Sequence, residues 1–237
     1  MLFLPMEPIT ATNSSGYGAP VGITVDAVVF TLLHGKLSVL LARRAEGPHE
    51  GDWALPGGFQ GATETPEQSV VRKLEEKTGM PPVYFEQLRF YGDPERDPRG
   101  WLPSVAYLSL VPCELLPEQT DTDAAWHPVD ELPELPFDHL QMVADGLDRL
   151  RGKLRYSNVA MGLLPERFTA RQARQVYEAI LGTRLPAANF TRDLLRTGLV
   201  RATGERRADG PGRPSEVLEF VSRSFSWSPA SRRVASR

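Results

Sequence analysis

The chain contains little cysteine, no long apolar run and no histidine cluster. Its single cysteine, Cys113, excludes an intrachain disulfide and a cysteine-based zinc site, and its apolar surroundings predict a buried, unreactive side chain. No apolar stretch approaches the roughly 20 residues of a membrane helix, so we expect no membrane partner. The opening MLFLPM lacks the basic flank of a signal peptide, and we therefore expect a cytoplasmic protein. His49, His127 and His139 lack metal-ligand spacing and predict only local hydrogen bonds.

Charge is distributed very unevenly along the 237 residues, although the net charge is only −3. Residues 1–148 contain 9 Lys and Arg against 23 Asp and Glu, whereas residues 149–237 contain 18 against 7. A basic segment of this strength favours a polyanionic partner, with nucleic acid as the first candidate. Compositional drift over solvated faces is the alternative. The acidic half argues against nucleic-acid binding in that part of the chain.

The first two thirds of the chain mix strand and helix patterns. Residues 1–20 have no periodicity and predict a flexible arm. Alternating apolar residues predict strands in VGITVDAVVFTLL and KLSVLLARR, joined by a turn at His34-Gly35, and in LRFYGDP and WLPSVAYLSLVPCELL. Helical periodicity marks 65–78 and 138–151. We therefore predict an α+β sandwich over residues 21–150.

After Gly152 strand-like runs give way to short helices. Thr169 and Gln172 form a capping box for a helix that Gly182 would end. One face of this helix carries an apolar stripe, made of Ala173, Val176, Tyr177 and Ile180. The pattern indicates that the domain boundary lies near 149–156.

A second helix, PAANFTRDLLRTG, follows, with Pro186 suited to its first position and Gly198 to its end. Two short strands, LVRAT and EVLEFV, come next. Helix, helix and a two-stranded wing predict a winged helix-turn-helix domain over residues 156–222. The Ser- and Arg-rich residues 223–237 predict a basic disordered tail.

The segment GGFQGATETPEQSVVRKLEEKTGM, residues 57–80, has the layout of a functional helix. Gly58, Glu64, Arg72 and Gly79 have the spacing of the Nudix box, which this segment resembles, and the resemblance extends over residues 21–148. Thr65-Pro66-Glu67-Gln68 supplies a capping box for the helix. The resemblance implies an α/β/α Nudix sandwich.

Three positions of this helix share one face, and in the enzymes of the Nudix family they carry magnesium-binding carboxylates. Here they are Lys73, Glu76 and Lys77, and Lys73 is spaced to pair with Glu76. Ammonium groups repel magnesium and offer it no lone pair. We therefore predict a pocket without catalysis, without metal and without a required cofactor. A weak magnesium ion held by Glu64 and Glu76, with residual hydrolysis, is the alternative.

The resemblance implies that the pocket binds a nucleoside diphosphate linked to a further group. Candidate ligand-binding residues are Arg43, Arg44, Trp53, Gly57, Gly58 and Arg99. Guanidinium forks suit phosphate oxygens, and an indole ring can stack on a base or ribose. The sequence DPRG at 97–100 resembles family members that handle ADP-ribose and related NAD metabolites. Surface or packing roles are the alternative for each of these residues.

The basic half contains a candidate DNA-reading face. Asn189, Arg192 and Arg196 fall on one side of the second helix, and both residue types make paired hydrogen bonds to bases in the major groove. Three arginines, Arg206, Arg207 and Arg213, predict that the wing lies beside a phosphate backbone or enters a minor groove. A helical packing module with a solvated face is the alternative.

Both halves together resemble the NrtR family, the Nudix-related transcriptional regulators, in GLLPERFTARQARQVYEAILGTRLPAANF and in the GRP of the wing. The resemblance implies a homodimeric repressor of NAD-metabolism genes that binds palindromic operator DNA and is released by ADP-ribose or a related molecule. We expect its hinge near Gly152 to Asn158. The competing hypotheses are a magnesium-dependent hydrolase of ADP-ribose or a related nucleotide, and an RNA-binding Nudix-like protein.

Overall fold

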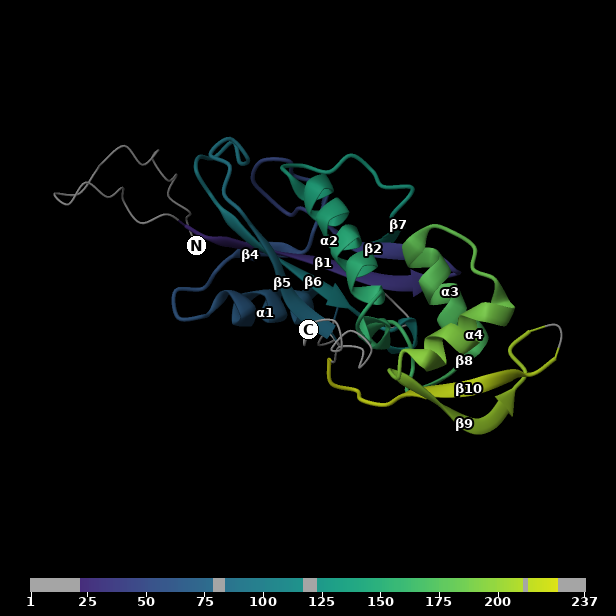
Figure 1. Ribbon diagram of the computed structural model, residues 1–237. Helices are drawn as coiled ribbons and strands as arrows, with labels where there is room; N and C mark the ends of the chain where they lie inside the picture. Colours follow the sequence, from purple (N-terminus) through teal and green to yellow (C-terminus); the bar gives the residue numbers. More distant parts are fainter. Residues whose placement is uncertain (1–21, 79–83, 117–122, 211–212, 226–237) are drawn as a thin grey trace.

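The computed structural model describes residues 22–78, 84–116, 123–210 and 213–225, which form an α/β/α sandwich followed by a smaller domain of helices and a β-sheet (Figure 1). The expected α+β architecture is therefore confirmed. None of the helices in these ranges has the length and apolar character that crossing a membrane requires. The predicted arm at 1–20 lies outside the described residues, as does most of the predicted tail at 223–237.

A seven-stranded sheet forms the centre of the first domain. Its main path runs β3-β2-β1-β6-β5, β4 pairs with β1, and β7 pairs with β2. Neighbouring strands are antiparallel except for the parallel pair β1 and β6. The strands are β1 (Thr24–Leu33), β2 (Lys36–Arg43), β3 (Trp53–Ala54), β4 (Gly57–Phe59), β5 (Tyr84–Tyr91), β6 (Ser104–Leu110) and β7 (Ala124–Pro128).

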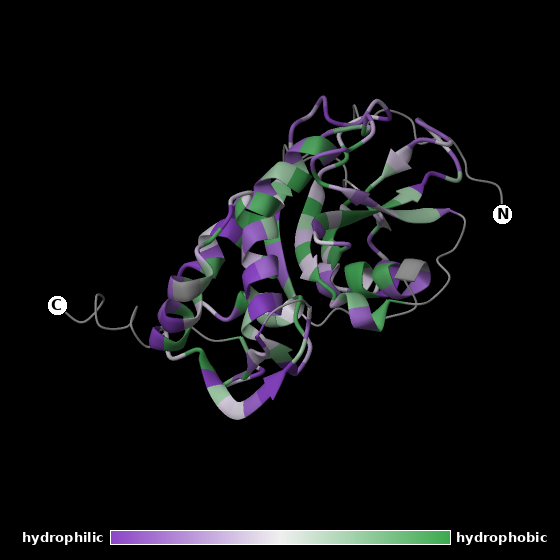
Figure 2. Cartoon of the chain, turned by 90° about the vertical axis from the view of Figure 1, so that its right-hand side faces the viewer, coloured by the Kyte–Doolittle hydropathy of each residue, from purple (hydrophilic) through white to green (hydrophobic). Residues whose placement is uncertain are grey.

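Alternation along β1 explains why the sheet is covered on both faces (Figure 1). Val25 and Val29 pack in one core cluster with the helix α1 (Pro66–Thr78), whereas Val28 and Phe30 pack in another with α2 (His139–Leu154). The expected hairpin turn joins β1 to β2, and His34 and Gly35 both adopt positive φ, 49° and 79°. Figure 2 shows hydrophobic segments gathered where helices and sheet meet.

The second domain contains a short 3₁₀ turn η2 (Val159–Gly162), helices α3 (Ala170–Leu181) and α4 (Ala187–Arg196), and three strands, β8 (Arg167–Thr169), β9 (Val200–Arg207) and β10 (Ser215–Phe220). The strands are ordered β8-β10-β9. The two predicted wing strands are present as β9 and β10, and β8 adds a third strand that the sequence did not predict. β8 has only three residues, and its partner in the register, β10, lies far along the chain. Such a strand has no local periodicity to reveal it.

The predicted helix signals in this domain are largely confirmed. Thr169 and Gln172 make both bonds of the capping box, and Gly182 ends α3 with φ 68°. Pro186 is the N-cap residue of α4 rather than its first helical residue. Gly198, with φ 69°, lies just past the end of α4.

Cys113 of the first domain lies in the 3₁₀ turn η1 (Cys113–Leu115) and is half-buried rather than fully buried. Burial raises the pKa of its thiol.

The two domains share one continuous hydrophobic core, in which Phe30 and Leu150 belong to the same cluster as Phe168 and Ile180. α2 continues to Leu154, three residues past its predicted end. The expected hinge, Gly152 to Asn158, therefore begins inside α2, and its last two residues, Ser157 and Asn158, are buried and hydrogen-bonded.

Asn158 anchors this junction, because its Nδ2 donates to the main-chain oxygens of Ser222 and Ser224, each at 2.9 Å. Phe225 then packs against Tyr84 of the first domain, with 5.6 Å between ring centroids. The chain after β10 therefore returns to the sandwich.

Candidate ligand-binding site and nucleic-acid interface

A cavity of about 620 Å³ opens at one end of the sandwich. Its walls are formed by residues of β1, β2, β4 and α1, by the segment at 96–99 and by the start of α2. Its lining includes the predicted ligand residues Arg43, Arg44, Gly57, Gly58 and Arg99. Trp53 lies beside the lining instead, where its ring stacks under the Arg43 guanidinium at 4.4 Å.

Two of the predicted arginines are held in place by neighbouring oxygens. Arg44 donates from Nε to the carbonyl of Pro48 at 2.8 Å, and its guanidinium lies 5.0 Å from the ring centre of Phe137. Burial, with the nearby Arg99 cation, holds the pKa of Arg44 below its usual range. Arg99 donates from Nε and Nη2 to Asp97, at 3.0 and 2.7 Å. Both guanidinium groups are therefore held in fixed positions at the cavity wall, where they can meet an anion.

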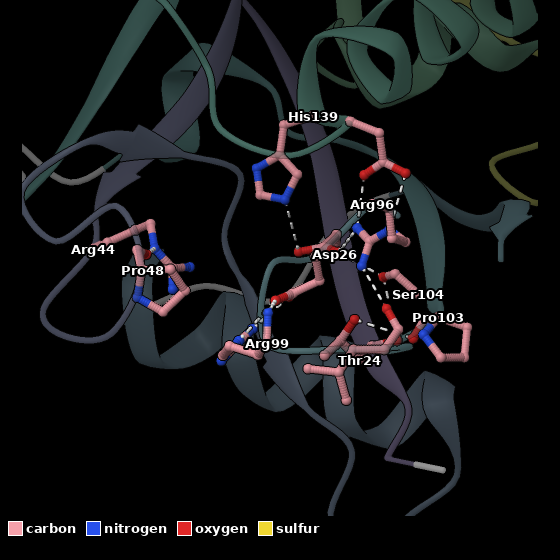
Figure 3. Close-up of polar contacts among 12 residues, drawn as sticks. Thr24, Asp26, Arg44, Pro48, Arg96, Arg99, Pro103, Ser104 and His139 are labelled. Atoms are coloured by element: carbon pink, nitrogen blue, oxygen red, sulfur yellow. Dashed lines mark hydrogen bonds and ion pairs between the residues drawn. The ribbon is translucent and has the colours of Figure 1, made fainter. Parts of the chain in front are cut away.

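A buried polar network, which the sequence did not reveal, borders the cavity, and its members Asp26, Arg96 and His139 belong to the lining (Figure 3). Arg96 makes a bidentate pair with Asp138, at 2.9 and 2.7 Å, and a third bond to the carbonyl of Leu102 at 2.8 Å. Asp26 accepts a hydrogen bond of 2.5 Å from Ser104. The network ties β1 and β6 to the start of α2.

His139, the first residue of α2, also lines the cavity and belongs to the same polar network. Its Nδ1 accepts a hydrogen bond from the main-chain N–H of Leu55 at 3.0 Å, and its Nε2 lies 3.6 Å from Asp26 Oδ1. Burial lowers the pKa of His139, so the ring is neutral at pH 7 and carries its proton on Nε2. Asp26, the only charged residue of β1, was the available sequence signal for this site.

Glycine is required at position 57 by the close approach of β4 to β1. A Cβ on Gly57 would lie 2.2 Å from Asp26 Oδ1 and 2.5 Å from the carbonyl of Val25. A Cβ on Gly58 would lie 3.1 Å from the Cε of Lys73, which also lines the cavity. The absence of side chains at Gly57 and Gly58 therefore lets β4 lie close to both β1 and α1.

The box helix begins as predicted, with Thr65 and Gln68 making both bonds of a capping box. Glu64 is fully engaged, because Arg72 pairs with both its oxygens at 2.8 Å and Ser69 donates to it at 2.6 Å. These bonds, led by that from Arg72, lower the pKa of Glu64 to about 2.

Glu76 is also engaged by cations. The expected pair between Lys73 and Glu76 is confirmed at 3.0 Å, and Arg72 reaches the other oxygen of Glu76 at 3.0 Å. The hydrogen bond from Lys73, then that from Arg72, holds the pKa of Glu76 below its usual range. Lys77 belongs to α1, but its side chain, like Gly79 and Met80, lies outside what the structure describes.

This donor set does not fit the magnesium ions of the Nudix enzymes. Glu64 and Glu76 each accept bonds from fixed cations, and Lys73 places an ammonium group among them. Within residues 22–78, 84–116, 123–210 and 213–225 no group of three or more His, Cys, Asp or Glu side chains is arranged to hold a metal.

The candidate DNA-reading face is formed by one side of α4. Asn189, Arg192 and Arg196 are all exposed, whereas Leu194 is buried. Phe190 packs on Tyr177 of α3, with 5.2 Å between ring centroids. The amphipathic helix therefore turns its polar side outward, as the sequence predicted. Arg192 Nη2 donates to Asn189 Oδ1 at 3.0 Å, which aligns the two side chains.

The predicted wing arginines lie on the β9–β10 hairpin. Arg206 and Arg207 are exposed in β9, and Arg213 is exposed before β10. Arg206 also donates to the carbonyl of Pro214 at 3.2 Å, across the hairpin. The hairpin thus presents a cationic edge next to the helix pair.

Glu178, which sequence reasoning missed, organises the turn between α3 and α4. Its carboxylate is buried and accepts from the main-chain N–H of Leu185 at 2.8 Å and from Arg174 at 2.9 Å. Arg184 donates to its second oxygen at 3.3 Å. This carboxylate fixes where α4 begins relative to α3.

Fold and sites define a class of protein in which a Nudix sandwich carries a winged-helix DNA-binding domain. A NUDIX domain model matches residues 22–146, and a model of the NrtR DNA-binding winged helix domain matches residues 160–220. The chain belongs to the NrtR family of Nudix-related transcriptional regulators.

Several relatives illustrate this membership. The chain is 32% identical over 223 residues to the "ADPR responsive transcriptional repressor NtrR" of Acinetobacter baylyi, covering 91% of this chain and 88% of the relative. It is similar to the crystal structure of Shewanella oneidensis NrtR complexed with a 27mer DNA, with a TM-score of 0.76 and 38% identity over 84% of this chain and 93% of the other. Its Nudix half is 38% identical over 108 residues to an ADP-ribose pyrophosphatase of Methanocaldococcus jannaschii, covering 45% of this chain and 64% of that enzyme.

Proposed function

We propose that this protein is a ligand-responsive transcriptional repressor of NAD biosynthesis and metabolism genes. It binds palindromic operator DNA as a homodimer and is released by ADP-ribose or a related NAD metabolite. The observation that carries the proposal is the presence, in one chain, of a cationic cavity and an exposed Asn/Arg helix face. The Acinetobacter relative, by its name, is an ADPR-responsive repressor.

DNA recognition is assigned to α4 and the wing. Asn189, Arg192 and Arg196 offer donors and acceptors for base edges in the major groove, and the wing arginines suit the phosphate backbone. Two copies would present two recognition helices to half-sites separated by one helical turn, about 34 Å, or a multiple of it. The relative from Shewanella, solved with a 27mer DNA, supports this assignment.

Effector binding is assigned to the cavity above the network of Asp26, Arg96 and His139. Arg44 and Arg99 provide guanidinium groups for phosphate oxygens. A cavity of about 620 Å³ falls within the ordinary range for small-molecule sites.

Coupling between the sites is assigned to α2. This helix begins at His139 in the cavity wall, and near its end Arg151 bonds to α3. An effector shifts an equilibrium only through differential affinity, so the bound cavity must favour a dimer arrangement in which the recognition helices are misaligned on the operator.

The decisive experiment uses a labelled palindrome from upstream of NAD-synthesis genes and the full-length protein. Fluorescence anisotropy should show binding without ligand and release as ADP-ribose is added. A scrambled duplex of equal length and composition is the control. Equal affinity for both duplexes would contradict sequence-specific repression, and light scattering on the complex would report whether two copies are bound.

We propose further that the protein is not a Nudix hydrolase, because Glu64 and Glu76 are engaged by Arg72 and Lys73. The similarity of the Nudix half to an ADP-ribose pyrophosphatase favours the hydrolase as the second candidate. Incubating the pure protein with ADP-ribose and magnesium, and measuring AMP, separates them. Substantial turnover that Glu76→Gln abolishes would favour the hydrolase.

A further inference from the structure

Lys73 occupies a position in the box helix where its side chain can reach a ligand. It lines the cavity, and its aliphatic chain lies against Gly58, with Cε 3.1 Å from the place where a Cβ on Gly58 would be. The side chain is only 26% exposed, so it packs against Gly58 rather than extending from α1 into solvent. Its ammonium group is held by Glu76 at 3.0 Å.

The negative charge of Glu76 is shared between two cations, because its carboxylate accepts a bond from Arg72 at 3.0 Å as well as the bond from Lys73. Arg72 is in turn shared with Glu64. Within this cluster Glu64 and Glu76 balance Arg72 and Lys73, and both carboxylates have their oxygens turned to protein cations. An incoming diphosphate therefore meets the ammonium group, not a pair of free carboxylates.

The charge of the cavity lining supports the same conclusion. Five cationic side chains line the cavity, from Arg43, Arg44, Lys73, Arg96 and Arg99, together with three carboxylates, from Asp26, Glu46 and Asp97. Two further carboxylates, Glu76 and Asp138, pair with Lys73 and Arg96 from outside the lining, so cations and carboxylates balance. A disubstituted diphosphate carries about two negative charges, one per phosphate, as in a nucleic-acid backbone. A glutamate at position 73 would change this balance from zero to −2 and repel the diphosphate unless a metal ion lay between them.

We infer that Lys73 takes the place of a divalent cation in effector recognition: with Arg44 and Arg99 it holds the diphosphate of a nucleoside diphosphate derivative, so binding and operator release need no metal. The inference rests on the proposed effector function and deepens it. Metal-independent sensing lets the repressor respond to effector concentration alone, whatever the free magnesium level.

The test is calorimetric titration of the full-length protein with ADP-ribose, once in EDTA and once in millimolar magnesium chloride. Wild type should show the same Kd in both buffers, within about twofold. Lys73→Ala should weaken binding about 10-fold or more in both, because a charged hydrogen bond to the diphosphate is lost. Lys73→Arg, which keeps the cation, should retain binding in EDTA. Lys73→Glu should lose binding in EDTA and regain part of it with magnesium.

Lys36→Ala is the matched control, since Lys36 also pairs with a glutamate, Glu131, but lies outside the cavity lining. It should leave the Kd unchanged, and thermal unfolding should show that all variants are folded. The inference is overturned if magnesium lowers the wild-type Kd by more than about 10-fold, or if folded Lys73→Ala binds ADP-ribose with the wild-type Kd. Either result leaves the effector function intact. Absence of ADP-ribose binding in either buffer would instead remove the proposed effector, and the inference with it.

Discussion

Arg151 donates a hydrogen bond of 3.0 Å from its Nε to the main-chain carbonyl oxygen of Ile180. The bond joins the last turns of two helices, α2 of the sandwich and α3 of the winged helix. Because α2 begins with His139 in the cavity wall, one rigid element of 16 residues, about 24 Å long, connects the ligand site to the DNA-binding domain.

Replacing Arg151 with alanine should weaken this connection. The side chain is 41% exposed, so the expected loss in unfolding free energy is modest, about 1 kcal/mol. The larger effect should be on coupling: operator affinity without ligand should stay near wild type, while ADP-ribose should release less DNA at saturation. Anisotropy titrations measure both quantities. Arg155→Ala, which removes an exposed arginine just past the same helix, is the control and should release DNA normally.

Replacing Arg192 with alanine should weaken specific operator binding by about 1–3 kcal/mol and relax sequence preference at one base position. The reason is the loss of a bidentate donor on the exposed face of α4, where Arg192 is aligned by Asn189. Gel shift on the palindrome and on single-base variants measures the effect. Arg89→Ala, which removes an exposed arginine from an aspartate pair in the sandwich, should bind DNA as wild type does. An unchanged operator affinity for Arg192→Ala would rule out this face.

Glu178→Gln should destabilise the winged helix and weaken DNA binding together. The carboxylate is buried and satisfies the N–H of Leu185 and two arginines, and losing charged hydrogen bonds of this kind costs about 1–3 kcal/mol. Urea unfolding and operator titration measure the two effects. Gln175→Ala, an exposed change on the same helix, should alter neither. Normal operator affinity in a destabilised Glu178→Gln protein would show that the Glu178 carboxylate is not needed to position α4 for DNA binding.

Acid should selectively remove the contribution of Glu64 to stability. Its pKa is lowered to about 2, mainly by hydrogen bonds from Arg72 and then Ser69, so the stabilisation is present above the ordinary glutamate pKa near 4.5 and is lost as pH falls from there towards 2. The difference in unfolding free energy between wild type and Glu64→Gln should therefore be largest near pH 7 and shrink through this window.

Urea unfolding at several pH values between 7 and 2.5 checks this prediction. Glu75→Gln, at an exposed position on the same helix, is the matched control for the effect of the substitution itself. A wild-type advantage over Glu64→Gln that persists unchanged at pH 2.5 would contradict the assigned role of the Arg72 pair.

Sequence patterns of short range predicted much of this molecule. The capping boxes at Thr65 and Thr169, the hairpin turn at His34-Gly35 and the polar face of α4 each depend on residues within one or two turns of chain, and all are confirmed. The pairing of Lys73 with Glu76 was predictable for the same reason, since residues three apart on a helix are neighbours.

The order of the two domains, the spacing of the box and the chemistry of its helix could therefore be read from local patterns. Three features depend on long-range packing instead: Arg96 meets Asp138, His139 faces Asp26 at the cavity, and β8 completes the wing sheet. These contacts join residues tens of positions apart, and packing selects them without leaving a local period. The same packing places Lys73 against Gly58, where a charge change visible in the sequence becomes part of a binding site.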